Sequence, residues 1–499
     1  MNSPRELSFS IRIRAGNRTL VDIPDYSLPE RRLMILFGES GIGKSLINRA
    51  VYGLLDGDEF QATINGQDAA SYTSTPWVRS VQENGFFVFQ EPSTHLYPLL
   101  TLGEQLREGS LKDSVSEDAI LGELWSGTPT ARPSSLLGVY PKPYRPSGGE
   151  KQRMLLAMAF KKIDLFLARG EAELPSLFLF DEPTGSLDNR FRDIVLSMLF
   201  DRYRRMAFTG VVVSHDYSLI SMIRKEHKDL AEAVVFRELA LEKSALVLRK
   251  FEPETYLGWL SVQHPPPRSP GGRQIARIES DVGVFHRTLT IARDREGSVP
   301  APLVLNQGAM TYLKAPSGTG KTTLAKMMIG LLRGERFSMT LGGDTVGVGT
   351  REEFWRKRVW GKSMTMVFQH ADEALNPRST VFDTFKGLPT ESMPTRDWVR
   401  RTLHELFEPD MADEILEREV SNLSGGQKQR LNLLRGLSLE TGLIILDEPL
   451  NGLDFESSIR VLDLLRERQQ RGNSILVISH NEEIFDSQVG DEGIYYLVQ

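Results

Sequence analysis

The chain contains the sequence GESGIGKS at residues 38–45 and a close copy, APSGTGKT, at residues 315–322. The first copy follows an apolar run, Leu33 to Phe37, and precedes the helix-compatible segment SLINRAVYGLL. Glycines let the backbone turn its N–H groups inward around a phosphate, and the following helix points its positive end at the same anion. The pattern therefore predicts a strand, a phosphate-binding loop and a helix in each half of the chain.

Four further motifs follow each loop in the same order. The first half continues with FQEP around Gln90, PSGGEKQR, LFLFDEP and VVVSH, and the second with FQHA around Gln369, LSGGQKQR, LIILDEP and LVISH. Gln90 and Gln369 lie 279 positions apart, and the serines of the SGG motifs, Ser147 and Ser424, lie 277 apart. Such steady spacing indicates an internal duplication.

Short, wholly apolar runs give the strongest strand signals in both halves. They end at Phe37, Phe180 and Val213 in the first half, and at Leu446 and Ile478 in the second. Runs without polar alternation are typical of strands covered on both faces. We therefore expect an α/β fold with two P-loop domains, each with a mainly parallel sheet and a small helical subdomain, at about residues 100–146 and 378–423.

A proline- and glycine-rich stretch, HPPPRSPGG at residues 264–272, separates the two halves. Consecutive prolines favour an extended backbone, and the glycines after them interrupt regular structure. The prediction is a first domain at 1–255, a linker at 256–274 and a second domain at 275–499. The first half is also 11 residues longer between its SGG serine and its DEP aspartate, which we interpret as a surface insertion within KKIDLFLARGEAELPS.

The composition excludes several classes of protein. The 499 residues carry a net charge of −6, which provides no bulk attraction for nucleic acid or an anionic membrane. The absence of cysteine excludes disulfides, thiolate metal sites and iron–sulfur clusters. No apolar run approaches the roughly 18 residues that a membrane-spanning helix needs. We expect a cytoplasmic protein whose membrane role, if any, comes through a partner.

The two loops are expected to bind the phosphates of a nucleotide. Lys44 would bridge phosphates and the Ser45 hydroxyl would coordinate Mg²⁺, with Lys321 and Thr322 in the same roles in the second copy. Ala315 replaces the first glycine there, and we expect binding to be retained. The predicted loop ligands are Gly38, Ser40, Gly41, Gly43, Lys44 and Ser45 in the first half, and Ser317, Gly318, Gly320, Lys321 and Thr322 in the second.

Two adjacent acids end a buried strand in each half. Asp181 and Asp447 are predicted to hold the Mg²⁺ shell, and Glu182 and Glu448 to polarise the water that attacks the γ-phosphate. A histidine also ends a later apolar strand in each half. Because His215 and His480 recur at matching places, we expect both to contact the γ-phosphate.

With these motifs the chain resembles an ATP-binding cassette (ABC) protein with two nucleotide-binding domains. The resemblance covers nearly the whole chain, and the SGGE and SGGQ signatures separate this family from other P-loop ATPases. It implies that the domains pair head to tail and that the signature of each closes over the ATP held by the other. The implied signature contacts are Ser147, Gly148, Gly149 and Glu150 for the second loop, and Ser424, Gly425, Gly426 and Gln427 for the first.

The same resemblance assigns further residues. Gln90 and Gln369 match the glutamine that senses Mg²⁺ and the attacking water. Ser186, Leu187 and Asp188 match a loop that crosses between the sites, and in the second copy Gly452 stands in place of the serine. Members of the family often stack an aromatic ring on adenine upstream of the P-loop. No aromatic was found where expected, so Arg14 and Arg293 are the candidates instead.

The glutamine neighbourhoods share the frame F-Q-x-x-x-x-x-L-x-P-x-x-T and resemble the ATPases of peptide and nickel importers. This implies that the chain hydrolyses ATP for transport and binds integral membrane permease subunits at the inner face of the plasma membrane. In that family the region lines the groove that receives a coupling helix of the permease. The alternative is a soluble tandem ABC ATPase that remodels a protein complex or acts on ribosomes. Neither cargo nor direction of transport follows from the motifs.

Overall fold

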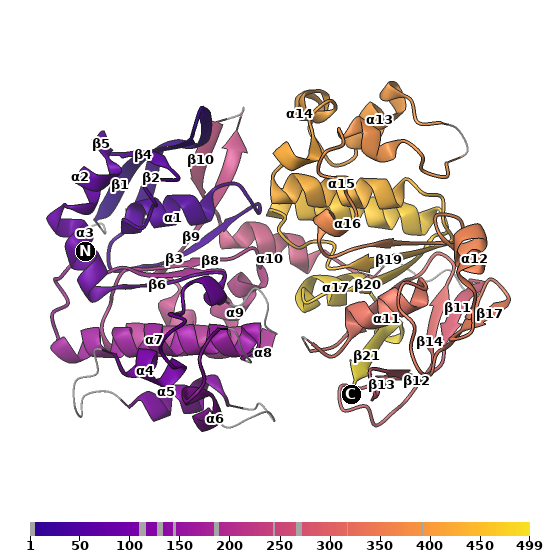
Figure 1. Cartoon of the computed structure of the whole chain (residues 1–499), viewed down its shortest axis with the longest axis horizontal. Helices are drawn as coiled ribbons and strands as arrows, with labels where there is room; N and C mark the ends of the chain where they lie inside the picture. Colours follow the sequence, from indigo (N-terminus) through magenta and orange to yellow (C-terminus); the bar gives the residue numbers. More distant parts are fainter. Residues whose placement is uncertain are drawn as a thin grey trace. The chain divides into compact units, whose positions relative to one another are not determined.

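The computed structural model describes residues 5–108, 116–126, 133–142, 146–183, 189–242, 245–265, 272–316, 318–390 and 393–499. The chain forms two compact units, Met1–Gly38 with Ile42–Tyr256 and Glu39–Gly41 with Leu257–Gln499, so the main boundary lies between Tyr256 and Leu257. Helix α10 (Pro253–Ser261) runs across this point, so regular structure continues into the segment predicted as a linker. Each unit is described by itself below (Figure 1).

A six-stranded sheet in the order β10-β9-β3-β8-β7-β6 forms the centre of the first unit. Strands β9, β3, β8, β7 and β6 are parallel, and β10 is antiparallel to β9. The bounds are β3 (Leu33–Gly38), β6 (Phe86–Val88), β7 (Phe178–Asp181), β8 (Gly210–Val213), β9 (Val234–Glu242) and β10 (Ala245–Lys250). An antiparallel sheet, β2-β1-β4-β5, is built from β1 (Glu6–Ala15), β2 (Arg18–Pro29), β4 (Gln61–Ile64) and β5 (Gln67–Asp68).

The helices of the first unit connect these strands. They are α1 (Lys44–Tyr52), α2 (Ala69–Thr73), α3 (Pro76–Asn84), α4 (Leu102–Arg107), α5 (Glu117–Leu124), α6 (Ser134–Leu137), α7 (Gly148–Arg169), α8 (Asn189–Arg205) and α9 (Ser218–Glu226). Three of them, α4, α5 and α6, lie within residues 100–146, where the sequence predicts a helical subdomain. Helices α4 and α5 pack against the long helix α7, α6 packs against α4, and Figure 1 shows the group on one side of the sheet.

The second unit repeats the plan with a seven-stranded sheet, β12-β13-β21-β15-β20-β19-β18, and a four-stranded sheet, β14-β11-β16-β17. Strands β21, β15, β20, β19 and β18 are parallel. The larger sheet contains β12 (Asp281–Val284), β13 (Arg287–Ala292), β15 (Met310–Lys314), β18 (Met364–Val367), β19 (Leu443–Asp447), β20 (Ser474–Ile478) and β21 (Ile494–Val498). The smaller one contains β11 (Gln274–Ile278), β14 (Leu303–Asn306), β16 (Ser338–Leu341) and β17 (Asp344–Gly347).

The helices of the second unit are α11 (Lys321–Met328), α12 (Glu352–Phe354), α13 (Arg396–Leu403), α14 (Pro409–Ile415), α15 (Gly425–Leu437), α16 (Phe455–Gln470) and α17 (Glu482–Gln488). Helices α13 and α14 form the small helical subdomain predicted for residues 378–423. The predicted fold class, two P-loop α/β domains with mainly parallel sheets, is confirmed.

Alternate residues of the central strands belong to two separate cores. In the second unit, Ile444 and Leu446 of β19 pack in one cluster with α15 and α16, whereas Leu443 and Ile445 pack in the other with α11 and the smaller sheet. This burial on both faces explains why the strand sequences show no polar alternation. The acidic side chains of the sites, Asp181 and Asp447, accordingly lie at strand ends.

The 11 additional residues of the first half lengthen a helix and its following turn. Helix α7 has 22 residues, whereas its counterpart α15 has 13. Phe166 in the extension is buried against Phe178 of β7, and Asp164 pairs with both Arg202 and Arg205 of α8. The interpretation as a surface insertion is therefore only partly right, because the added turns of helix are packed on the core.

In the part of the chain that the structure describes, no helix is long and apolar enough to cross a membrane.

Candidate active sites

The first P-loop connects the end of β3 with the start of α1. Gly38, Gly41 and Gly43 have φ angles of 140°, 79° and 111°, a region that side chains other than glycine rarely adopt. Gly43 also stands where a Cβ atom would come within 2.9 Å of Val21. The Lys44 ammonium donates a hydrogen bond to the Gly38 carbonyl at 2.7 Å, which holds this side chain across the loop.

The second P-loop repeats this geometry except at its first position. Gly318 and Gly320 have φ angles of 79° and 109°, matching Gly41 and Gly43. Ala315 is outside the positive-φ region, so the loop begins with a backbone that alanine tolerates. Lys321 still donates to the carbonyl of residue 315, at 2.6 Å. Ser317 lies outside the described residues.

A buried aspartate ends the strand beside each loop. Asp181 and Asp447 are both 1% exposed. Burial raises the pKa of Asp181 to about 6 against the opposing effect of the neighbouring Ser45 hydroxyl, and burial raises the pKa of Asp447 against the effect of Thr322. Within the described residues, both carboxylate oxygens of Asp181 and Oδ2 of Asp447 have no hydrogen-bond partner.

Orphaned carboxylate oxygens beside a hydroxyl are suitable ligands for a divalent cation. Mg²⁺ prefers oxygen ligands and is usually held by one or two carboxylates together with substrate phosphates. The described residues contain no cluster of three or more His, Cys, Asp or Glu side chains that would hold a metal without such a substrate. The pairs Ser45 with Asp181, and Thr322 with Asp447, therefore fit a Mg²⁺ ion bound with a nucleotide.

The structure brings three predicted residues of the first site together. Gln90 Nε2 donates to Glu182 Oε2 at 2.8 Å, and His215 Nδ1 lies 3.8 Å from Glu182 Oε1. Burial alone would raise the pKa of Glu182, but His215 and Lys44 bring it below its usual value. Burial would lower the pKa of His215, but the adjacent Glu182 carboxylate raises it. The arrangement thus stabilises an ionised Glu182.

The second site holds its glutamate with different groups. Glu448 Oε2 accepts hydrogen bonds from the Ser479 hydroxyl at 2.9 Å and the His480 backbone N–H at 3.1 Å. His480 Nε2 lies 3.4 Å from Glu448 Oε1 and 3.4 Å from the Lys321 ammonium. Burial raises the pKa of Glu448 to about 7. Gln369 is half-buried and, among the described residues, has no hydrogen bond to Glu448, so its role remains a prediction.

Both glutamates adopt an unusual backbone conformation. Glu182 has a φ of 45° and Glu448 a φ of 49°, whereas side chains other than glycine seldom adopt positive φ. Such strain persists where the surrounding structure imposes it, and it is concentrated at functional sites. Its recurrence at two equivalent positions, each before a proline, supports a functional role for both carboxylates.

Each signature serine begins a helix. Ser147 caps α7, accepting from the Glu150 N–H at 3.2 Å, while Glu150 Oε2 accepts from the Ser147 N–H at 2.7 Å. Ser424 and Gln427 make the same reciprocal pair at the start of α15, at 3.1 and 3.0 Å. Gly148 and Gly149 therefore lie in the first turn of α7, and Gly425 and Gly426 in that of α15, where backbone N–H groups have no partner within the helix and face the positive end of its dipole.

The residues predicted to cross between the sites are only partly described. Ser186, Leu187 and Asp188 lie outside the described residues. In the second copy Gly452 has a φ of 74°, and Asp454 caps α16 by accepting from the Ser457 N–H at 2.7 Å. Asp454 thus has a structural role within its own unit.

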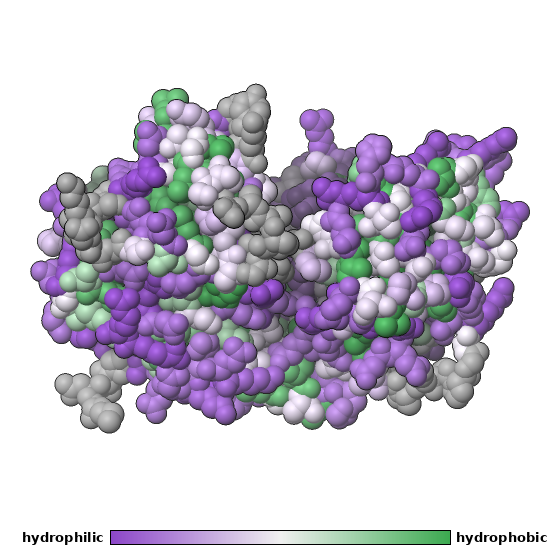
Figure 2. All heavy atoms as spheres, turned by 90° about the horizontal axis from the view of Figure 1, so that it is seen from below, coloured by the Kyte–Doolittle hydropathy of each residue, from purple (hydrophilic) through white to green (hydrophobic). Residues whose placement is uncertain are grey.

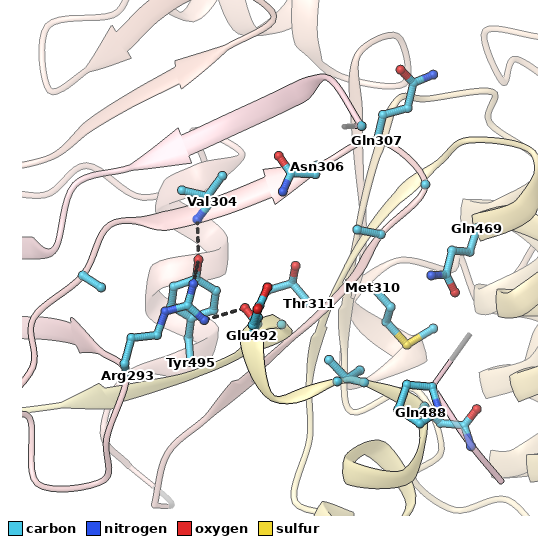
Figure 3. A pocket seen from close by; sticks show the side chains of 18 of the residues that line it. Arg293, Val304, Asn306, Gln307, Met310, Thr311, Gln469, Gln488, Glu492 and Tyr495 are labelled. Carbon is cyan, nitrogen blue, oxygen red and sulfur yellow. Dashed lines mark hydrogen bonds between the residues drawn. The ribbon is translucent and has the colours of Figure 1, made fainter. Parts of the chain in front are cut away.

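Arg293 makes its contacts with Tyr495, away from the P-loop. Its guanidinium lies 3.6 Å from the centre of the Tyr495 ring and donates to the Tyr495 hydroxyl at 2.6 Å (Figure 3). It also lines a cavity of about 810 Å³ at the start of β15, whereas the P-loop follows the end of this strand. Arg293 is therefore not placed to stack on adenine, and Arg14 lies exposed on β1.

The structure shows an exposed aromatic side chain, Phe285, that the sequence motifs do not identify. Phe285 is 65% exposed in the two-residue turn between β12 and β13, and both Phe285 (φ 51°) and His286 (φ 59°) have positive φ. The same hairpin reaches the P-loop, because a Cβ atom on Gly320 would lie 3.1 Å from Leu289 of β13. In the sequence, the sign that could have identified Phe285 is an aromatic residue in a two-residue turn, where Asn and Gly are usual.

Comparison with known proteins gives the following similarities. Residues 21–185 and 300–451 match the family described as ABC transporter. The peptidoglycan transport ATP-binding protein YejF of Agrobacterium fabrum is 25% identical over 517 residues, which cover 98% of this chain and 90% of that protein. The glutathione import ATP-binding protein GsiA of Shigella dysenteriae serotype 1 is 24% identical over 527 residues, covering 95% and 81%. The solved structure of an RNase-L inhibitor covers 98% of this chain and 89% of its own, with a TM-score of 0.62 and 15% identity, and shares the fold.

Proposed function

Since the chain belongs to the ABC transporter family, we propose that it is the ATP-hydrolysing subunit of an importer for a peptide or a peptide-like compound. The full-length relatives named for peptidoglycan transport and glutathione import support this proposal, because both cargoes contain peptide-linked amino acids. The observation that carries it is that each unit places an aspartate and then a glutamate at the end of a central strand, with a histidine beside the glutamate. The chain would work at the inner face of the plasma membrane with integral permease subunits.

Each hydrolytic site would use the groups that its unit brings together. Lys44 would neutralise the phosphates, while Ser45 and Asp181 would hold Mg²⁺, which supplies further positive charge there. Glu182, oriented by Gln90 and His215, would accept a proton from the water whose oxygen attacks the γ-phosphorus as the bond to ADP breaks. Lys321, Thr322, Asp447, Glu448 and His480 would have these roles in the second site. In keeping with the family, each P-loop would be completed by the signature of the other unit.

The adenine of the second site would stack on Phe285. Base–aromatic stacking is worth about 1–3 kcal/mol per base. Phe285→Ala is therefore expected to weaken ATP binding by about 5- to 150-fold, measured by fluorescent-nucleotide titration in a Lys44→Ala background that disables the first loop. Phe285→Tyr should retain affinity. Val299→Ala, at another exposed position of the same unit, is the control, and equal affinity for Phe285→Ala and this control would reject the stacking role.

The transport function can be tested in the native host. Strains lacking the chain would be complemented with the wild type or with Glu182→Gln plus Glu448→Gln, and uptake of labelled di-, tri- and oligopeptides would be measured. We expect one peptide class to enter only with the wild type. The wild-type chain should also copurify with integral permease subunits from solubilised membranes. Unchanged uptake of every class, together with cosedimentation with ribosomes, would instead support the soluble alternative.

A further inference from the structure

A cavity of about 810 Å³ opens in the second unit at the start of β15, at the other end of this strand from the P-loop. Its walls combine apolar side chains, such as Met310 and Val489, with the amides of Asn306 and Gln469 (Figure 3). Cavities that bind small molecules commonly measure about 300–1,000 Å³ and are mainly apolar with a few polar groups. By contrast, the face in Figure 2 shows hydrophobic side chains in scattered groups on a mainly hydrophilic surface. We call this space the β15 cavity.

One wall of the cavity carries a buried hydroxyl group. Thr311 is the second residue of β15 and is 3% exposed, and its backbone pairs with Leu476 of β20. Within the described residues, the Thr311 hydroxyl has no hydrogen-bond partner. Buried polar side chains usually have one, in the protein or in a bound molecule. Because Thr311 lines the β15 cavity, a ligand in the cavity can supply the missing partner.

The other polar groups of the cavity suit an amide-containing ligand. Asn306 and Gln307 line it at the end of β14, and Gln469 lines it from the last turns of α16. In the part of the chain that the structure describes, these three side chains make no hydrogen bond. Each amide offers both donors and an acceptor, which is the pattern that a peptide group matches. Arg293, held against Tyr495, adds a positive charge to the lining and forms no ion pair with any described residue.

The first unit has different side chains at the corresponding positions. Helices α8 and α16 begin 266 positions apart, so Tyr203 corresponds to Gln469. Tyr203 is 8% exposed, and its hydroxyl donates to the carbonyl of Arg31, two residues before β3, at 2.7 Å. Strands β3 and β15 begin 277 positions apart, so the apolar Met34 corresponds to Thr311. An aromatic ring and a thioether thus stand in the first unit where the second has an amide and a hydroxyl.

We propose that the β15 cavity binds a short peptide. The amides of Asn306 and Gln469 would pair with its peptide groups, and the Thr311 hydroxyl would gain its partner. Arg293 would attract the terminal carboxylate. This inference rests on the proposed function, because an importer of peptides delivers such compounds to the side of the membrane on which the chain would work. Since the cavity and the P-loop lie at opposite ends of β15, peptide and ATP would occupy separate sites.

Isothermal titration calorimetry of the full chain with trialanine, in the absence of nucleotide, would test this site. Gln469→Tyr introduces the residue that the first unit has at this position, and the ring would occupy the cavity and remove the amide. We therefore expect this variant to bind trialanine at least about tenfold more weakly than the wild type. Gln470→Tyr changes the exposed neighbouring position of α16, so it is the matched control and should bind trialanine with wild-type affinity. Both variants should bind a fluorescent ATP analogue as the wild type does, which shows that they are folded.

Removal of the buried hydroxyl provides a second measurement. Thr311→Val retains the shape of the side chain and should weaken trialanine binding by about 2- to 13-fold, the usual effect of losing one hydrogen bond. Equal affinity of the wild type and Gln469→Tyr, or no binding of trialanine at millimolar concentrations, would overturn this inference. Binding of adenosine in place of trialanine would also overturn it, because amides can pair with a nucleobase. These results leave the transport function intact, whereas unchanged uptake of every peptide class in the strain lacking the chain would overturn that function whatever the calorimetry shows.

Discussion

Replacing Glu182 and Glu448 together with glutamine is expected to lower steady-state ATP hydrolysis by about 10²- to 10⁴-fold, the usual contribution of a general base. Glutamine retains the shape of the side chain but cannot accept the proton of the attacking water. Glu448 is buried and the Glu182 side chain is only 14% exposed, and each follows the aspartate that ends its strand, next to the P-loop. Phosphate release, followed continuously with Mg²⁺ and saturating ATP, measures the effect.

The loss of hydrolysis can be assigned to catalysis only if the double variant still binds ATP. The double variant should therefore bind a fluorescent ATP analogue with wild-type affinity, whereas Lys44→Ala plus Lys321→Ala should lose binding. Glu171→Gln plus Glu440→Gln removes one exposed carboxylate from each unit and leaves both hydrolytic glutamates in place, so it controls for loss of charge. Hydrolysis by the double variant at the wild-type rate would refute the assignment of both carboxylates.

The two sites are also expected to respond differently to acid. A glutamate acts as a base only when it is deprotonated. Because burial raises the pKa of Glu448 to about 7, the hydrolysis that remains in Glu182→Gln should fall as pH drops through 7, by about tenfold at pH 6. The pKa of Glu182 is below its usual value, so the hydrolysis that remains in Glu448→Gln should be nearly constant between pH 8 and pH 6.

Initial rates at saturating Mg²⁺ and ATP across this pH range would test the difference. Nucleotide binding should be measured at each pH, so that a change in affinity is not counted as a change in turnover. Identical pH profiles for the two single variants would contradict the inequality of the sites. A profile that falls in Glu448→Gln and not in Glu182→Gln would reverse the assignment of the two pKa values.

The sequence predicts those features that depend on local pattern. Wholly apolar runs such as Leu443 to Leu446 identify strands buried on both faces, and the structure confirms this burial. Glycine positions in the P-loops correspond to positive φ angles at Gly41, Gly43, Gly318 and Gly320, because few other residues adopt that backbone. The two-domain fold follows from such local rules.

Local sequence patterns do not predict the features that depend on tertiary contacts. Gln90 reaches Glu182 across 92 positions, whereas Ser479 holds Glu448, and nothing in the two nearly identical motifs distinguishes these arrangements. Arg293 is a candidate for adenine stacking because it lies upstream of the second P-loop in the sequence. In the structure its guanidinium packs on the Tyr495 ring instead. The prediction of a surface insertion in the first half is only partly right, because the sequence KKIDLFLARGEAELPS does not reveal that Phe166 has a partner in β7.

The unequal lengths of α7 and α15 have a mechanical consequence. At 1.5 Å per residue, α7 extends about 33 Å and α15 about 20 Å. The far end of α7 is tied to α3, because Arg169 donates to Asn84 at 3.0 Å, and α3 leads directly into the strand that precedes Gln90. A displacement of the Ser147 end of α7 would therefore reach the segment before Gln90 through one continuous helix. Helix α15 is nine residues shorter, so a displacement of Ser424 would travel along a shorter helix.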